Sequence, residues 1–137
     1  MKTVSLRDIL ITVRVFKNKW FHRWSRGEGV SDSALLAAAA EIAAGKVEAN
    51  LGGYLFKKRL PRSGSGKSGG YRTIVGYRKP NSERIIFLYA FSKNTKANIS
   101  DKEEAALSLA AEAFISAADA QVGKLLAEGS IWEVQYE

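Results

Sequence analysis

Residues 54–91 contain three stretches with the pattern of β-strands: YLFKKRL at 54–60, YRTIVGYRK at 71–79 and RIIFLYAF at 84–91. Aromatic and β-branched residues recur in them, and turn-forming residues separate them. Arg84–Phe91 is almost wholly apolar, which predicts a central strand that is buried on both faces. Because the connections are short, we expect the three strands to pair antiparallel.

Upstream of this unit, the pattern predicts one strand followed by a helical hairpin. Ile11–Phe16 alternates apolar residues with Thr and Arg, as a strand does. Lys17–Arg26 has an apolar side at helical spacing, and an alanine-rich helix is expected from Asp32 to Ala44, with Ser31 as its N-cap. The two helices are expected to pack together on the sheet.

Downstream, the sequence predicts two helices and a short strand. Ser100 and Glu103 have the spacing of a capping box, which predicts a helix that begins there and runs to about Ile115. Ser116 with Asp119 repeats that signature for a second helix that ends near Gly129, and 131–134 has the composition of an edge strand.

The element order β-α-α-β-β-β-α-α predicts an α+β fold. We expect a small antiparallel or mixed sheet, with an N-terminal helical hairpin and C-terminal helices. Residues 11–134 are expected to form a single domain, and residues 1–10 a peripheral extension.

The composition restricts the chemistry. The 137 residues include no cysteine and one histidine, His22, which excludes disulfides, thiolate ligands and cysteine nucleophiles and makes a metal centre unexpected. No cofactor is expected. The N-terminus lacks the apolar core of an export signal, and no stretch has the ~18 consecutive apolar residues of a membrane span, so a cytoplasmic protein is predicted.

The net charge of +7 is distributed unevenly. Residues 1–99 contain 19 Lys and Arg and 6 Asp and Glu (+13), whereas residues 100–137 contain 2 and 8 (−6). A strongly basic body predicts a polyanionic partner such as RNA. The alternative is that the charge serves solubility alone.

The basic residues are concentrated between positions 57 and 78. Lys57 and Arg59 lie two positions apart on a strand and therefore share a face, and Arg72 begins the next strand. If the two strands pair, these cations converge on a patch that is wide enough for one or two phosphates. The full set of cations and interleaved tyrosines is Lys57, Lys58, Arg59, Arg62, Lys67, Tyr71, Arg72, Tyr77 and Arg78.

Converging cations suit RNA cleavage without a metal ion. When a ribose 2′-hydroxyl attacks the adjacent phosphate, negative charge increases on the non-bridging oxygens, and fixed cations stabilise that charge. A solvated face that only binds RNA would have the same spacing, and the spacing alone does not separate the two readings. Trp20 and Trp24 could stack on bases, but residues at this helical spacing more often belong to a core.

Three stretches resemble a known toxin family. They are residues 57–61 (KKRLP), 66–72 (GKSGGYR) and 87–94 (FLYAFSKN), accompanied by VFK at 15–17 and by Trp20, Phe21 and Trp24. The chain resembles the HigB-like branch of the RelE/ParE toxins over roughly residues 11–134.

The resemblance implies the toxin of a type II toxin–antitoxin system. Toxins of the RelE type enter the ribosomal A site and cleave messenger RNA. Their antitoxin is often a helix-turn-helix protein, and the complex binds operator DNA. By motif match, Lys57 and Arg59 fall at phosphate-contacting positions, and Arg72 falls at the position of the arginine that stabilises the transition state.

The sequence departs from the RelE pattern after the last strand. RelE enzymes have a second arginine there and, further on, a tyrosine that stacks on the target base. Here Lys93 and Lys96 are the candidates for the charge, and Tyr71 or Tyr77 for the stacking surface. ParE-type members of the same fold act on DNA gyrase and need no nuclease centre, so a gyrase toxin and a non-toxic RNA-binding module remain alternatives.

Overall fold

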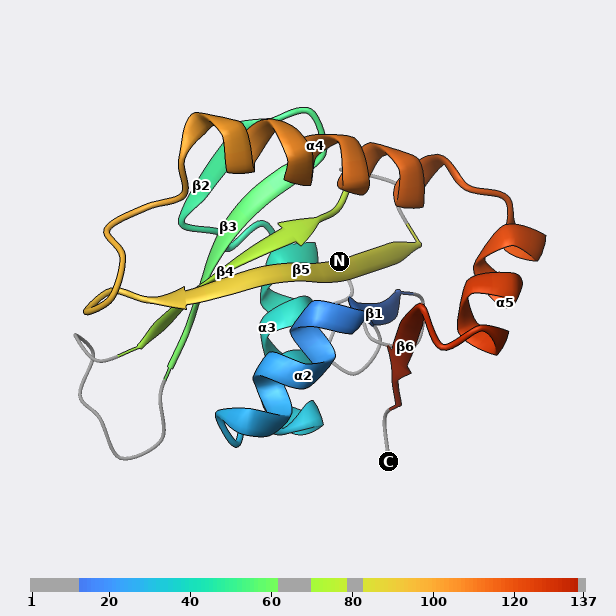
Figure 1. The fold of residues 1–137 in the computed structure, drawn as a ribbon, viewed down its shortest axis with the longest axis horizontal. Helices are drawn as coiled ribbons and strands as arrows, with labels where there is room; N and C mark the ends of the chain where they lie inside the picture. The colour runs from blue at the N-terminus through green and yellow to red at the C-terminus, as the bar shows by residue number, and fades with distance from the viewer. Residues whose placement is uncertain (1–12, 62–69, 79–82, 136–137) are drawn as a thin grey trace, which may run out of the picture.

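The computed structural model describes residues 13–61, 70–78 and 83–135, which form a layered α+β arrangement around one sheet (Figure 1). The six strands of the sheet have the order β2-β3-β4-β5-β1-β6. Helix α4 covers one face, and helices α2 and α3 cover the other (Figure 1). No helix among these residues is long and apolar enough to cross a lipid bilayer.

The sheet is mixed. Neighbouring strands pair antiparallel except β1 and β5, which are parallel. The strands are β1 (Arg14–Asn18), β2 (Ala49–Gly52), β3 (Leu55–Leu60), β4 (Tyr71–Gly76), β5 (Arg84–Ser92) and β6 (Ile131–Val134). The helices are α2 (Lys19–Gly27), α3 (Asp32–Ala43), α4 (Asp101–Ser116) and α5 (Asp119–Ala127).

Each face of the sheet has its own apolar core. On the α2/α3 face, Phe21 and Ile42 belong to the same buried cluster as Phe56 and Phe87 from the sheet. On the α4 face, Phe114 packs edge-on against Phe16, with 5.1 Å between ring centroids. Burial of such side chains on both faces is the main source of stability for a sheet of this size.

Two features fix helix α4 over the sheet. Gly76 in β4 allows a close approach, because a Cβ at that position would lie 3.1 Å from the Cβ of Ala111. At the end of the helix, Arg84 Nη1 donates hydrogen bonds to the carbonyls of Phe114 and Ala117 at 2.9 and 2.6 Å. The Nη2 atom of Arg84 also pairs with Asp119 at 2.7 Å, which ties α5 to the same arginine.

The predicted α+β class is confirmed, and so are the antiparallel pairing of the three central strands and the helical hairpin on the sheet. Ser31 and Ser100 cap their helices as predicted, Ser100 within a full capping box. Strand β2 was not predicted. The strand expected at 11–16 is observed as β1 from Arg14 to Asn18, and residues 1–12 lie outside the described part, so the N-terminal extension and the domain limits stay predictions.

The capping box predicted at Ser116 and Asp119 is wrong. The N-cap of α5 is Ala118, and no side chain makes a hydrogen bond at that cap. The reason is that α4 continues to Ser116, so this serine is the last residue of one helix rather than the cap of the next. The chain between the two helices is held instead by Arg84.

Candidate functional site

A cross-strand pair of arginines forms the centre of the candidate site. In the antiparallel register of β3 and β4, Arg59 lies directly opposite Arg72, and Lys57 lies opposite Ile74. Directly opposed residues point to the same face of a sheet, and so do residues two apart on one strand. Since Ile74 belongs to the α4-side core, Lys57, Arg59 and Arg72 all lie on the α4 face, and we call these three residues the basic face.

The basic face is half-buried rather than fully solvated. All three side chains have intermediate exposure, whereas the neighbouring Leu55 and Ile74 on the same face are fully buried. Among the described residues, no carboxylate forms an ion pair with any of the three cations, and none accepts a hydrogen bond from the buried Nη1 of Arg72. The face therefore combines partial desolvation with uncompensated positive charge, which strengthens attraction for a phosphate.

Gly70 supports the position of Arg59. A Cβ on Gly70 would lie 2.9 Å from the carbonyl oxygen of Leu60 and 3.6 Å from Nε of Arg59. The backbone of Gly70 therefore lies close against the end of β3, where a larger residue would displace it. This explains in physical terms why glycine directly precedes Tyr71 and Arg72.

An irregularity in β5 places aromatic side chains beside these cations. The register shifts so that Ile74 opposes Tyr89 whereas Val75 opposes Phe87, which leaves one extra residue in β5. Such a bulge reverses the alternation of side chains beyond it. As a result, Tyr89 and Phe91 join the α4 face, where Phe91 lies opposite Arg72.

The exposed edge of this aromatic group is Trp20, at the beginning of α2. Its ring centroid lies 4.6 Å from that of Tyr89, and 40% of the residue is exposed. Lys96 approaches Tyr89 from another side, with Nζ 5.4 Å from the ring centroid.

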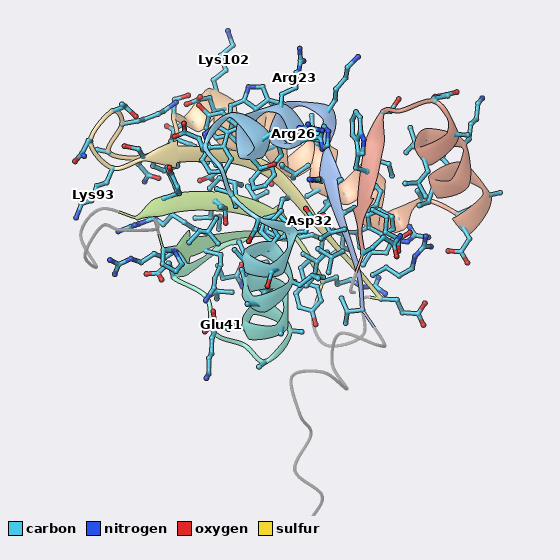
Figure 2. The ribbon with its side chains drawn as sticks, turned by 90° about the horizontal axis from the view of Figure 1, so that it is seen from below. Arg23, Arg26, Asp32, Glu41, Lys93 and Lys102 are labelled. Atoms are coloured by element: carbon cyan, nitrogen blue, oxygen red, sulfur yellow. The ribbon has the colours of Figure 1, made fainter. Side chains whose placement is uncertain are left out.

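The two lysines that follow β5 have different surroundings. Lys96 Nζ forms an ion pair with Glu103 at 2.5 Å, which raises the pKa of Lys96 and, with the backbone of Ser100, lowers the pKa of Glu103 to about 2. Lys93 is exposed and projects from the turn beyond β5, far from the labelled acidic residues of α3 (Figure 2). Of the two, Lys93 has the charge that no described carboxylate compensates.

The sequence of the chain also matches the model of a known protein family. A family model described as "RelE toxin of RelE / RelB toxin-antitoxin system" matches residues 13–134. The chain belongs to the RelE toxin family. A comparison with curated proteins gave no match. As a toxin of such a system, the protein has an antitoxin as a partner.

Several side chains that we predicted to bind RNA point away from the basic face of this RelE-family toxin. Lys58 is 7% exposed on the opposite face, where Nζ donates to the carbonyl of Lys46 at 3.0 Å and pairs with Glu41 at 3.3 Å. Tyr71 and Tyr77 are each 3% exposed and belong to the α2/α3-side core, so neither ring is available for stacking.

Arg78 is exposed but lies at the other end of β4, with its guanidinium 5.9 Å from the ring centroid of Tyr54. Six residues along a strand separate it from Arg72 by about 20 Å. Arg62 and Lys67 lie outside the described residues.

The single histidine of the toxin is distant from the basic face. His22 stacks on Trp132 of β6, with 4.1 Å between ring centroids, and burial lowers its pKa. Within the described ranges, no cluster of three or more His, Asp or Glu side chains has the arrangement of a metal site.

From the sequence we assigned Trp20 to a core and did not single out Tyr89. The helical spacing of Trp20 and Trp24 suggested a core pair, and Trp24 does pack against the α2/α3-side core. Trp20 lies at the first turn of α2 and reaches past the end of β1 to Tyr89. A bulky aromatic residue two positions after the helix N-cap, here Asn18, was the local sign of this position.

Proposed function

We propose that this RelE-family toxin is a ribosome-dependent endoribonuclease that cleaves messenger RNA without a metal ion and so inhibits translation. The observation that carries the proposal is the pairing of Arg59 with Arg72 across β3 and β4, with Lys57 on the same face. Three cations without a described carboxylate partner can surround one phosphodiester from the sheet side.

The chemistry follows from the charge that develops during cleavage. The ribose 2′-hydroxyl releases its proton to water as its oxygen attacks the adjacent phosphorus, the bond to the 5′-oxygen breaks, and a 2′,3′-cyclic phosphate remains. Arg59 and Arg72 stabilise the extra negative charge on the non-bridging oxygens, because strand pairing fixes the backbone positions from which both side chains extend on one face. Lys57 is the candidate for protonating the departing 5′-oxygen, and Lys93 for holding RNA beyond β5.

The partners that we propose rest on the sequence resemblance to this toxin family. The stretches at 66–72 and 87–94 favour the HigB-like branch, an antitoxin of the helix-turn-helix type, and contact with operator DNA through the antitoxin complex alone. The ribosome and messenger RNA are the proposed target, which requires a cytoplasmic toxin. An acidic antitoxin segment would be attracted to the basic body.

The test is cleavage of messenger RNA in a purified translation system, mapped by primer extension with and without ribosomes. The parent protein is expected to produce cuts only in ribosome-bound transcripts. The variant with Lys57, Arg59 and Arg72 all changed to alanine is expected to produce none. Lys124→Ala, which removes one cation from the exposed side of α5, is the control for loss of a surface charge elsewhere and should cut as the parent does.

Other outcomes would favour the alternatives. Intact transcripts together with DNA damage in arrested cells would indicate a gyrase toxin and contradict the proposal. RNA binding without any growth defect on induction would indicate a binding module. A triple alanine variant that is as lethal as the parent would also overturn the nuclease proposal.

A further inference from the structure

The outer surface of α2 is a second basic surface of the molecule. Lys19, Arg23 and Arg26 are exposed and recur at spacings of four and three residues, which places them along one side of the helix. No acidic residue occurs within α2, and no described carboxylate forms an ion pair with these three cations. Figure 2 shows Arg23 projecting away from the body of the protein.

Trp20 connects this surface to the basic face. On one side its ring lies parallel to that of Trp24, with an interplanar angle of 9° and 6.4 Å between centroids. The Trp20 ring also contacts Tyr89, which shares the α4 face with Arg72. Trp20 thus contacts two other rings and remains 40% exposed, so it offers an apolar surface next to the cations of α2.

We propose that the RNA strand next to the scissile phosphate runs from the basic face over Tyr89 and Trp20 onto α2. One base stacks on the exposed side of Trp20, and Lys19 and Arg23 bind the phosphates that flank this base. The inference rests on the proposed function, since it names the path of the same substrate away from the site of cleavage.

The chemistry of this surface favours single-stranded RNA over an acidic protein segment. Cations alone would attract either partner. An aromatic platform between cations matches the alternation of bases and phosphates in a single strand, and stacking on such a platform is independent of base identity. Lys19 and Arg23 lie about one helical turn apart, ~6 Å, which is comparable with the spacing of successive phosphates in an extended strand.

The experiment measures binding of a fluorescent 12-nucleotide 2′-O-methyl RNA, which lacks the attacking hydroxyl and cannot be cut, so that unaltered active-site residues can be used. Trp20→Ala is expected to weaken binding about tenfold, as loss of one stacked base does. Trp20→Phe should restore most of it. Leu109→Ala removes another large apolar side chain, which is 70% exposed on α4, and should bind as the parent does.

The charge contribution is tested on the same oligonucleotide. Arg23→Glu should weaken binding and reduce the log–log salt slope by about 0.7, the value for one lost contact to a phosphate of a single strand. Lys124→Glu changes the net charge equally on α5 and is expected to leave the slope unchanged. An abasic oligomer of the same length should bind the parent and Trp20→Ala equally.

Either of two results would overturn the inference. In the first, Trp20→Ala and Trp20→Phe both bind the RNA as tightly as the parent does. In the second, Lys124→Glu weakens RNA binding as much as Arg23→Glu does. Circular dichroism and thermal unfolding of each variant separate a folding defect from a lost contact. Failure of the proposed function would be distinguished by the cleavage assay. Either the alanine variants of the basic face would still cleave messenger RNA, or the parent would not cleave it at all. If cleavage depends on the basic face but RNA affinity is unchanged by substitution of Trp20, only the proposed RNA path over α2 is wrong.

Discussion

Lys57 and Lys58 are neighbours in β3, yet the two faces of the sheet give them opposite surroundings. Lys58 points toward α3, where the carbonyl of Lys46 and the carboxylate of Glu41 bind its ammonium. Lys57 points to the α4 face beside Arg59 and Arg72, where no described carboxylate pairs with it. One face pairs its lysine within the chain, whereas on the other face no described carboxylate pairs with the cations.

The difference extends along both strands. On the α2/α3 face the hydroxyl of Thr73 donates a hydrogen bond to the carbonyl of Lys58 at 2.8 Å, and Tyr71 is buried in the core. On the α4 face the corresponding positions are occupied by Arg59 and Arg72. Half-buried cations without a carboxylate partner cost stability, and positions that retain such a cost are candidates for functional sites.

The largest expected effect is on cleavage by Arg72→Ala. If the basic face is catalytic, loss of one preorganised donor lowers the cleavage rate on ribosome-bound messenger RNA by about 10² to 10³, equivalent to ~2.7–4 kcal/mol. Unfolding in urea should show a stability equal to or above that of the parent, because no described partner of this guanidinium is lost. A cleavage rate within twofold of the parent would contradict the contrast between the faces.

Gly70→Ala is expected to affect both the fold and the site. The new methyl group would lie 2.9 Å from the carbonyl oxygen of Leu60, so the backbone next to Arg59 must move. A cost of about 1–3 kcal/mol is typical of such overpacking, and the displacement should reduce cleavage as well. Urea unfolding and the cleavage assay measure the two effects. Gly27→Ala, where a Cβ meets nothing within 4 Å, is the control.

Lys58→Met is expected to destabilise the protein and to leave RNA cleavage unchanged. The variant keeps the apolar length of the side chain but removes the donor to the Lys46 carbonyl, and we expect a loss of about 1–2 kcal/mol in urea unfolding. Lys57→Met is the matched substitution on the other face and should reduce cleavage with little change in stability. If both variants behaved alike, the two faces would not differ in role.

The smallest expected effect is the pH dependence that Glu103 contributes. Because its pKa is lowered from 4.5 to about 2 in the folded protein, its pairing with Lys96 stabilises the fold fully above pH ~4.5. This contribution is lost as the pH falls from about 4.5 through about 2. In Glu103→Gln the stability should fall less over that range than in the parent, as measured by thermal unfolding at a series of pH values. Parallel curves for the two proteins would exclude the contribution.

Local pattern predicted a large part of the molecule. The alternation of β3 placed Lys57 and Arg59 on one face, and capping residues fixed where α3 and α4 begin, since both depend on neighbours within a few positions along the chain. The pairing of Arg59 with Arg72 was predicted only on the condition that β3 and β4 pair. The assigned roles of these residues remain predictions until cleavage is measured.

The sequence by itself determined the helices, the strands other than β2, the clustering of cations and their alternation along β3, because these features follow from dihedral periods and local hydrogen bonds. Only the tertiary structure decided that Tyr71 and Tyr77 are buried, that Glu103 pairs with Lys96, and that β1 lies parallel to β5. It also decided that one extra residue in β5 turns Tyr89 toward the basic face, where Trp20 meets it. These outcomes depend on the register between distant strands and on which helix covers which face, and no short stretch of sequence encodes either of them.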